Sequence, residues 1–206
     1  MLPIEVLSAF MLTAILLGLS PGPDNIFVLT HSAMSGARAG VMVVLGLCSG
    51  LVIHSIAVAL GLAALIAASA TAFTVIKFAG AGYLLFLAYK AFGAKASGHD
   101  DDVPKLSGGQ LYRRGFIMNI TNPKVAIFFL AFFPQFMKPE LGQLPLQATQ
   151  LGALFIVATF VVFGGIALAA GSLSDLLNRS PKTEVWINRV AGVVFVGLAA
   201  NIVFSK

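Results

Sequence analysis

The chain has 206 residues, of which 58% are hydrophobic and only 10% are charged, and its formal net charge is +5. Soluble globular proteins carry about 25% charged residues, so a soluble domain of this composition lacks the polar groups to cover its surface. Nucleic-acid binding is disfavoured too, because the basic residues lie in connections between apolar segments, as topology determinants do. The single cysteine, Cys48, excludes a disulfide framework, a redox pair and a thiolate metal cluster.

Six apolar segments are long enough to cross a lipid bilayer, which takes about 20 residues of helix. Within lipid, every backbone polar group must be satisfied internally, and the strict alternation of β-barrel strands is absent. The sequence therefore predicts an all-α, polytopic membrane protein with six transmembrane helices. In chain order the segments cover residues 4–32, 41–68, 70–92, 115–137, 146–172 and 185–204.

The first segment, 4–32, is predicted to be a retained helix and not a cleaved signal peptide. No Lys or Arg precedes it, and it is longer than the about 7–15 apolar residues of a signal-peptide core. A proline inside a helix removes a hydrogen-bond donor and clashes with the preceding turn. The freed backbone groups of a proline-rich break are therefore expected to face a cavity inside the protein. This break reads Ser20-Pro21-Gly22-Pro23-Asp24-Asn25.

The fourth segment, 115–137, contains a similar break with the sequence Asn119-Ile120-Thr121-Asn122-Pro123-Lys124. The chain thus divides into a first three-helix half (1–92), a polar linker expected on the cytoplasmic side (93–114) and a second three-helix half (115–206). Because three is an odd number, a duplicated half enters the membrane in the opposite orientation. We therefore predict two inverted three-helix repeats with broken first helices. Paired breaks of this kind are the best sequence indication of a transporter's binding site.

The distribution of Lys and Arg predicts the orientation, because these residues collect on the cytoplasmic side. The connections 33–40, 93–114 and 173–184, together with Lys90, hold eight of them. The opposite side holds little beyond Lys138 and the C-terminal lysine. We therefore expect both termini to face the outside.

Asp24 is the only acidic residue well inside an apolar segment. A carboxylate at the bilayer centre costs about 2.5–3.5 kcal/mol on insertion scales, and such residues usually face an interior cavity and act there. Lys124 in the other break is its natural partner, although an ion pair that only holds the breaks together is an alternative. We assign substrate binding or gating to the residues Pro21, Gly22, Pro23, Asp24, Asn25, Asn122, Pro123 and Lys124.

The charges of the two breaks match those of an amino acid. Asp24 would meet the ammonium, while Lys124 and the amides after Pro123 would meet the carboxylate, since a helix N-terminus presents free amides and a positive dipole end. His54 could relay protons together with Asp24, because an imidazole has an ordinary pKa of about 6.5. A neutral packing histidine explains His54 equally well. No catalytic residue, metal site, cofactor site or nucleotide-binding motif is recognised.

The two breaks combine with four further motifs into a specific pattern. The motifs are Pro21-Gly22-Pro23, Gly36-x3-Gly40, Gly80-Ala81-Gly82-Tyr83-Leu84, Asn122-Pro123-Lys124, Phe128-Phe129 and Phe133-Pro134-Gln135-Phe136. In this combination the chain resembles the LysE/RhtB family of bacterial amino-acid exporters along nearly its whole length. The resemblance implies a multi-pass protein of the bacterial inner membrane that exports a homoserine- or threonine-like, lysine-like or leucine-like amino acid or a close derivative. It also implies proton or cation antiport, contact with membrane lipid and, in many members, a homodimer.

Three other functions stay open at this stage. A metal or inorganic-ion carrier of the wider superfamily is disfavoured by the lone cysteine and the single intramembrane carboxylate, because a divalent ion needs several ligands. A membrane redox enzyme would need a cysteine pair in the breaks, and the sequence has none there. A non-transporting scaffold subunit leaves a carboxylate inside the membrane without an explanation.

Overall fold

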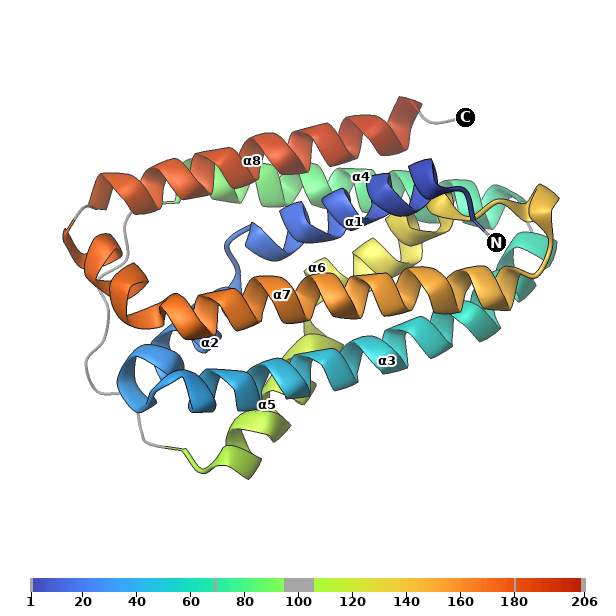
Figure 1. Cartoon of the computed structure of the whole chain (residues 1–206). Coiled ribbons are helices and arrows are strands. Elements are labelled where there is room, and N and C mark those ends of the chain that lie inside the picture. Colours follow the sequence, from blue (N-terminus) through green and yellow to red (C-terminus); the bar gives the residue numbers. More distant parts are fainter. Residues whose placement is uncertain (1, 69, 95–105, 180, 205–206) are drawn as a thin grey trace.

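The computed structural model describes residues 2–68, 70–94, 106–179 and 181–204. Every regular element in these ranges is helical, which confirms the predicted all-α fold, and the long helices form an elongated bundle (Figure 1). The elements of the first half are α1 (Ile4–Leu19), α2 (Pro23–Ser35), α3 (Ala37–Ala68) and α4 (Ala70–Gly93). Those of the second half are α5 (Gly108–Thr121), α6 (Pro123–Ile127), the π-helical turn η1 (Phe128–Phe132), the 3-10 turns η2 (Phe133–Phe136) and η3 (Pro139–Leu141), α7 (Leu144–Arg179) and α8 (Pro181–Phe204).

Both predicted breaks interrupt a helix. The chain bends by 64° between α1 and α2, and by 47° between α5 and the segment Pro123–Phe136, which contains α6, η1 and η2. Pro23 and Pro123 stand at the start of the helices that follow the two breaks. A proline fits the first position of a helix because its missing N–H is one of the donors that have no intrahelical partner there. The prolines therefore restart the two helices in a new direction.

Fewer candidate membrane spans are found within the described ranges than the six that the sequence predicts. Within the described ranges, three stretches are long and apolar enough to cross a membrane alone, namely Ala37–Gly61 in α3, Leu144–Ala170 in α7 and Val185–Phe204 in α8. The number rises to five when each bent pair of helices counts as one span. The helix α4, which corresponds to the third predicted span, is not among them. The predicted total of six spans in two repeats is therefore not confirmed.

The connections between helices are also shorter than predicted. The expected connection 33–40 is reduced to Gly36, whose φ of +84° is a left-handed conformation that glycine adopts readily. The expected connection 173–184 is mostly helical, because α7 extends to Arg179 and α8 begins at Pro181. The sequence prediction ended each helix where its apolar segment ended, whereas these helices continue into the polar sequence beyond it.

The helix α5 begins at Gly108, within the segment 93–114 that we assign to the polar linker. Ser107 and Gln110 form a capping box, in which the Ser107 hydroxyl accepts from the Gln110 amide at 3.4 Å and the Gln110 side chain accepts from the Ser107 amide at 2.8 Å. This start signal is local and lies in polar sequence, where an apolar pattern gives no indication of it. Linker residues 95–105 lie outside the described residues.

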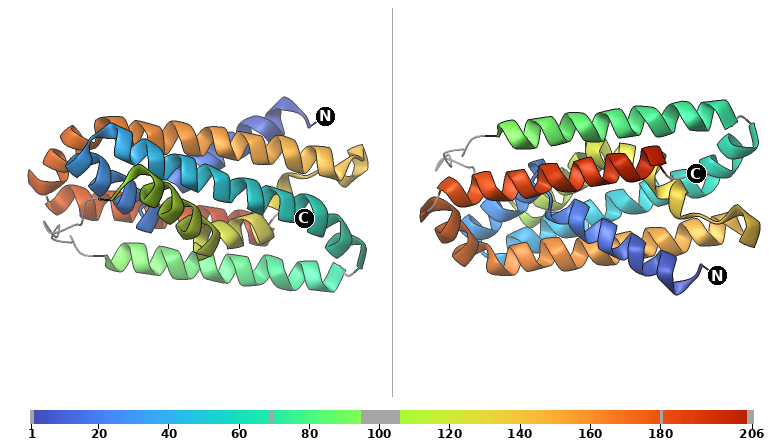
Figure 2. Two further views of the ribbon diagram at one scale, coloured as in Figure 1. Left: turned by 90° about the horizontal axis from the view of Figure 1, so that it is seen from below. Right: turned by 90° about the horizontal axis from the view of Figure 1, so that it is seen from above.

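The long helices pack in pairs that combine the two halves of the chain. The helix α3 packs against α5 and α7, α4 packs along α8, and α7 also contacts α1 and α2. Seen from above, α1 crosses the bundle obliquely, while α4 and α8 run side by side (Figure 2). Small residues let helices approach closely in a membrane. A β-carbon at Gly46 of α3 would overlap the carbonyl of Tyr112, and one at Gly115 of α5 would overlap that of Val43.

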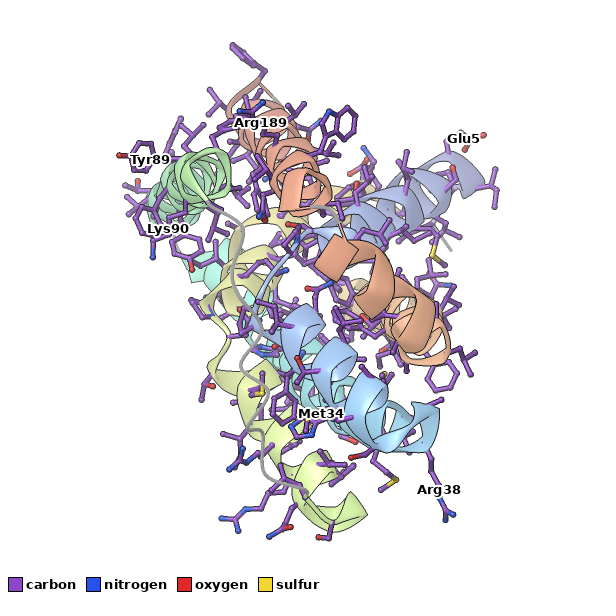
Figure 3. All side chains as sticks on the ribbon, turned by 90° about the vertical axis from the view of Figure 1, so that its left-hand side faces the viewer. Glu5, Met34, Arg38, Tyr89, Lys90 and Arg189 are labelled. Atoms are coloured by element: carbon purple, nitrogen blue, oxygen red, sulfur yellow. The ribbon has the colours of Figure 1, made fainter. Side chains whose placement is uncertain are left out.

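Charged side chains lie in two very different environments. Glu5, Arg38 and Lys90 point away from the bundle at its periphery (Figure 3). Asp24 and Lys124 are only 4% and 8% exposed, and they are the only buried Asp, Glu, Lys or Arg among the residues whose burial is described. Each of these two residues follows one of the two breaks, so the bundle concentrates its buried charge where its helices are interrupted.

Replacing Gly46 by valine should destabilise the protein, because the added β-carbon meets the backbone of α5. Overpacking of this kind costs about 1–3 kcal/mol. Gly61 is a matched control, since it lies on the same helix and no atom is within 4 Å of its β-carbon position. We expect purified Gly46→Val to unfold at a lower temperature in detergent than Gly61→Val. Equal unfolding temperatures would contradict the close contact between α3 and α5.

Candidate functional site

The first break places a buried carboxylate at the start of α2. After α1 ends at Leu19, Ser20 and Gly22 adopt extended backbone conformations, and α2 begins at Pro23. Asp24 is the second residue of α2, and its side chain points into the bundle, where it is 4% exposed. The break between α1 and α2 therefore places the Asp24 carboxylate in the interior of the bundle.

The second break is held by the side chain of Asn122. This residue lies between α5 and α6, and its Oδ1 accepts the backbone N–H of Lys124 at 3.0 Å, which caps α6. The cap leaves the Asn122 amide nitrogen as a donor on the interior of the bundle, where Asn122 is 5% exposed. One asparagine thus ends α5, starts α6 and presents a donor to the rest of the site.

Hydrogen bonds join the two breaks across 98 residues of sequence. Asn122 Nδ2 donates to Asp24 Oδ2 at 2.8 Å. Lys124 Nζ donates to the carbonyl of Leu17, in the last turn of α1, at 3.4 Å and to that of Ser20, directly after α1, at 3.0 Å. Carbonyls at a helix C-terminus have no intrahelical partner and favour a cation. The Asp24 carboxylate and the Lys124 ammonium also attract each other, although their hydrogen bonds go to different groups.

Several buried oxygens at the first break have no hydrogen-bond partner among the described residues. They include the second carboxylate oxygen of Asp24 (Oδ1), the hydroxyl of Ser20 and the amide oxygen of Asn25. The Asn25 nitrogen is engaged, since it donates to the carbonyl of Gly18 at 2.7 Å. Buried polar groups are nearly always hydrogen-bonded in stable structures. This group of acceptors is therefore suited to a ligand that supplies donors, such as an ammonium group.

The prolines and the glycine of the two breaks set the course of the backbone, and none of them is buried in the site. Pro23 and Pro123 are exposed, and Pro21 is half-buried. Gly22 leaves room for the lysine, because a β-carbon there would lie 3.1 Å from Lys124 Nζ. The eight residues that we assigned from the sequence therefore lie at one place, with Asp24 and Lys124 supplying its charges.

His54 belongs to a neighbouring part of the bundle. It lies on α3, where its ring stacks on Phe129 at 5.3 Å and its Nε2 contacts the carbonyl of Asn119 at 3.4 Å. The same carbonyl accepts the backbone N–H of Asn122 at 3.2 Å. His54 is therefore linked to the second break through Asn119, and its environment combines a packing contact with a polar one.

The structure adds residues that the sequence reading did not assign to the site. Asn119 is 2% exposed, and its amide oxygen is buried without a described partner. Ser20 is also 2% exposed and contributes both its carbonyl and its hydroxyl. Farther along α2, His31 and Ser32 are buried too. Asn119 lies in the last turn of α5, three residues before Asn122 of the break, and this short spacing is a signal that could have identified it.

Comparison with known proteins gives a consistent result. The family model described as LysE type translocator matches residues 15–206. The chain is 36% identical over 199 residues to the homoserine/homoserine lactone efflux protein of Salmonella typhimurium, which covers 96% of each chain. It is 35% identical to the protein of the same name from Salmonella typhi over 199 residues, or 96% of each chain. It is 32% identical to an uncharacterized membrane protein of Vibrio cholerae over 209 residues, or 98% of each chain. No solved structure matches the chain.

Asp24→Asn and Lys124→Met should not have additive effects on stability. Breaking a buried charge pair by removing one partner costs about 3–5 kcal/mol, because the other charge is left uncompensated. Removing both charges should therefore cost less than the sum of the two single changes. Thermal unfolding of the two single variants, the double variant and the wild type forms the double-mutant cycle. Strict additivity would show that the two charges do not interact.

Proposed function

Because the chain belongs to the LysE type translocator family, and is thus a transporter and not an enzyme, we propose that it exports a small neutral amino acid with a hydroxyl-bearing side chain, or a close derivative. One observation carries this proposal: the only buried carboxylate and ammonium among the residues whose burial is described stand at two helix breaks that hydrogen bonds join. The relatives named for homoserine and homoserine lactone efflux support the same class of solute.

The hydrogen-bonding capacity of the site matches a zwitterion. Asp24 Oδ1 is open to the substrate ammonium, because only Oδ2 is engaged by Asn122. An ammonium has three donors, and Lys124 Nζ uses two of them on α1 carbonyls, which leaves one for the substrate carboxylate. A lysine-like solute carries a second cation, and the described residues offer it no second buried carboxylate. The site therefore favours a solute with one charge of each sign.

The same carboxylate provides a way to couple export to an ion gradient. A proton or another cation and the substrate ammonium would compete for Asp24, so that entry of the cation from outside displaces the substrate outward. His54 is a second candidate for proton transfer, because it contacts Asn119 beside the second break. Antiport of this kind requires that substrate and cation do not occupy the site together.

We further propose six membrane spans in two inverted repeats, with α4 as the additional span. Its 24 residues give a length of about 36 Å at 1.5 Å per residue, and it runs along α8, which is itself apolar enough to span. In the proposed repeats, α1, α3 and α4 of the first half correspond to α5, α7 and α8 of the second half. The contact of α3 with α5 then corresponds to the contact of α7 with α1. The contacts of α3 with α7 and of α4 with α8 each join two corresponding helices.

We place the protein in the bacterial inner membrane, as a homodimer with periplasmic termini. Both ends of the chain lie at one end of the bundle (Figure 1). The helix ends that adjoin the connections rich in Lys and Arg, namely the ends of α2, α4 and α7 and the starts of α3, α5 and α8, lie at the opposite end (Figure 1). By the positive-inside rule this end is the cytoplasmic side. A metal carrier gains no support, because no three His, Cys, Asp or Glu residues come together in the part of the chain that the structure describes.

The orientation can be tested with single cysteines in a Cys48→Ser background. Gly109 and Glu140 are both exposed and lie at opposite ends of the bundle in the proposed topology. We expect a membrane-impermeant thiol reagent to label Glu140→Cys in intact cells, and Gly109→Cys only after the cells are permeabilised. The Cys48→Ser protein without a new cysteine is the control. Labelling of Gly109→Cys in intact cells would reverse the assigned topology.

Asp24→Asn should abolish export and leave the protein inserted and folded. Losing one partner of a buried hydrogen-bonded charge contact costs about 2–5 kcal/mol, so transport should fall by at least about thirtyfold. The measurement is counterflow in proteoliposomes with homoserine, threonine, leucine and lysine. Glu5→Gln is the matched control, because Glu5 carries the same charge at the periphery of α1 (Figure 3). Wild-type rates in a well-folded Asp24→Asn protein would remove Asp24 from the mechanism.

A further inference from the structure

A cavity of about 260 Å³ opens between α1, the turns η1 and η2, and α8. Its polar lining consists of Thr13, Gln135 and Asn201, and its aromatic lining of Phe132 and Phe136. No charged side chain lines it. The lining residue Ala9 lies five residues after the start of α1, and Asn201 lies three residues before the end of α8, so the cavity is nearer the end of the bundle where both termini lie (Figure 1).

The cavity lies on the same helix faces as the breaks, only a short distance away. Thr13 precedes Leu17 by one turn of α1, or about 6 Å along its axis, and the Leu17 carbonyl accepts a hydrogen bond from Lys124. On the opposite wall, Lys124, Phe128 and Phe132 follow each other at four-residue spacing, which keeps them near one face of the helix. Both walls therefore lead from the buried charges to the cavity.

Aromatic rings pack together beside the cavity, and one of them, Phe128, is one turn from Lys124. Phe10 is fully buried, and its ring centroid lies 6.0 Å from that of Phe128, 5.5 Å from Phe133 and 5.1 Å from Phe136. Phe128 also packs on Phe132 at 5.4 Å. We call these five side chains the aromatic barrier. Since Phe132 and Phe136 line the cavity, one side of the barrier faces the cavity and the other side continues toward the breaks.

The backbone beside the cavity departs from a regular α-helix. In η1 the N–H of Phe133 donates to the carbonyl of Phe128, five residues back, and η2 is a 3-10 turn. The Gln135 side chain donates to the carbonyl of Ala131 at 2.8 Å, which satisfies a carbonyl of the π-helical turn. At membrane depth, irregular backbone occurs where it is buried in protein or lines a water-filled cavity. π-Helical turns are also frequent at functional sites.

We propose that this cavity is a second, outward-side binding site, which holds the exported solute after it has passed the aromatic barrier. The inference rests on the proposed export function and adds a place on the exit route. With no charged lining, the cavity suits a small zwitterionic amino acid better than one with a net charge. The lining carries the neutral amide of Asn201 and the hydroxyl oxygen of Thr13, whose hydrogen is donated to the Ala9 carbonyl at 2.9 Å, and aromatic faces attract an ammonium. The volume equals about nine waters at roughly 30 Å³ each, which accommodates an amino acid with a short side chain.

Filling the cavity should block export without disturbing the packing. Gly197 lines the cavity, and no atom lies within 4 Å of its β-carbon position, so Gly197→Leu adds its side chain without a backbone clash. Gly82→Leu on α4 is the matched control, because its surroundings are equally open. We expect homoserine counterflow to fall at least about tenfold in Gly197→Leu, or about 1.4 kcal/mol, and to stay near wild type in Gly82→Leu. Equal rates in the two variants would overturn the inference.

A second measurement does not depend on transport. In the Cys48→Ser background, Thr13→Cys should react from outside with a charged, membrane-impermeant thiol reagent, and homoserine should slow the reaction. Leu12→Cys is the control, since Leu12 is 59% exposed on the lipid-facing side of the same helix and should not react. Reaction of Thr13→Cys only with a lipid-soluble reagent would identify a lipid site, and disulfide cross-linking between two copies would identify a subunit interface. Either result would overturn the inference.

The two measurements also separate this inference from the export proposal. If the wild type transports no amino acid while homoserine protects Thr13→Cys, the binding site stands and the export function fails. If the wild type transports homoserine while Gly197→Leu is fully active and Thr13→Cys is unprotected, export stands and the outward site is wrong.

Discussion

Asp24 and Lys124 bring one negative and one positive charge into a bundle that buries no other Asp, Glu, Lys or Arg among the residues whose burial is described. A buried ion costs several kcal/mol unless a partner and further hydrogen bonds compensate it. Asn122 supplies a donor to the carboxylate, and the end of α1 supplies carbonyls to the ammonium. Each break therefore provides what the other lacks, and the two halves of the chain must come together for either charge to be stable.

This mutual dependence explains why both breaks have a similar construction. Pro23 and Pro123 start the helices that follow the two breaks, and the residues directly after them carry the charges. The helices α3 and α7 then pack together and enclose the breaks, and the glycines of α3 and α5 allow the close approach that brings Asn119 and Asn122 inward. Small residues on the long helices and polar residues at the breaks thus serve one purpose, which is to bring the charged helix ends together away from lipid.

Local sequence contained enough information to predict the all-α fold, both breaks and the presence of Asp24 and Lys124 in them. Proline positions and an isolated carboxylate in an apolar segment are local signals, and they identify a break without any knowledge of tertiary contacts. The carbonyl acceptors at Leu17 and Ser20 were not predictable, because a backbone carbonyl leaves no trace in the sequence. The cavity beside Thr13 was not predictable either, since it depends on how α1, η2 and α8 pack. Helix ends such as Gly108 were missed because their capping signals lie in polar sequence.

The connection between the charges and the aromatic barrier follows from the continuity of one helical segment. Lys124 lies in α6, and Phe128 begins η1 directly after it, so the ammonium and a ring of the barrier are one turn apart on the same rigid piece of backbone. Lys124 is tied to the end of α1 through two carbonyls, and its third donor is the one proposed for the substrate carboxylate. A ligand shifts a conformational equilibrium only by its difference in affinity for the two states. On the proposed export function, that difference would arise where Lys124 meets the substrate, one turn away from the Phe128 ring that packs against Phe10.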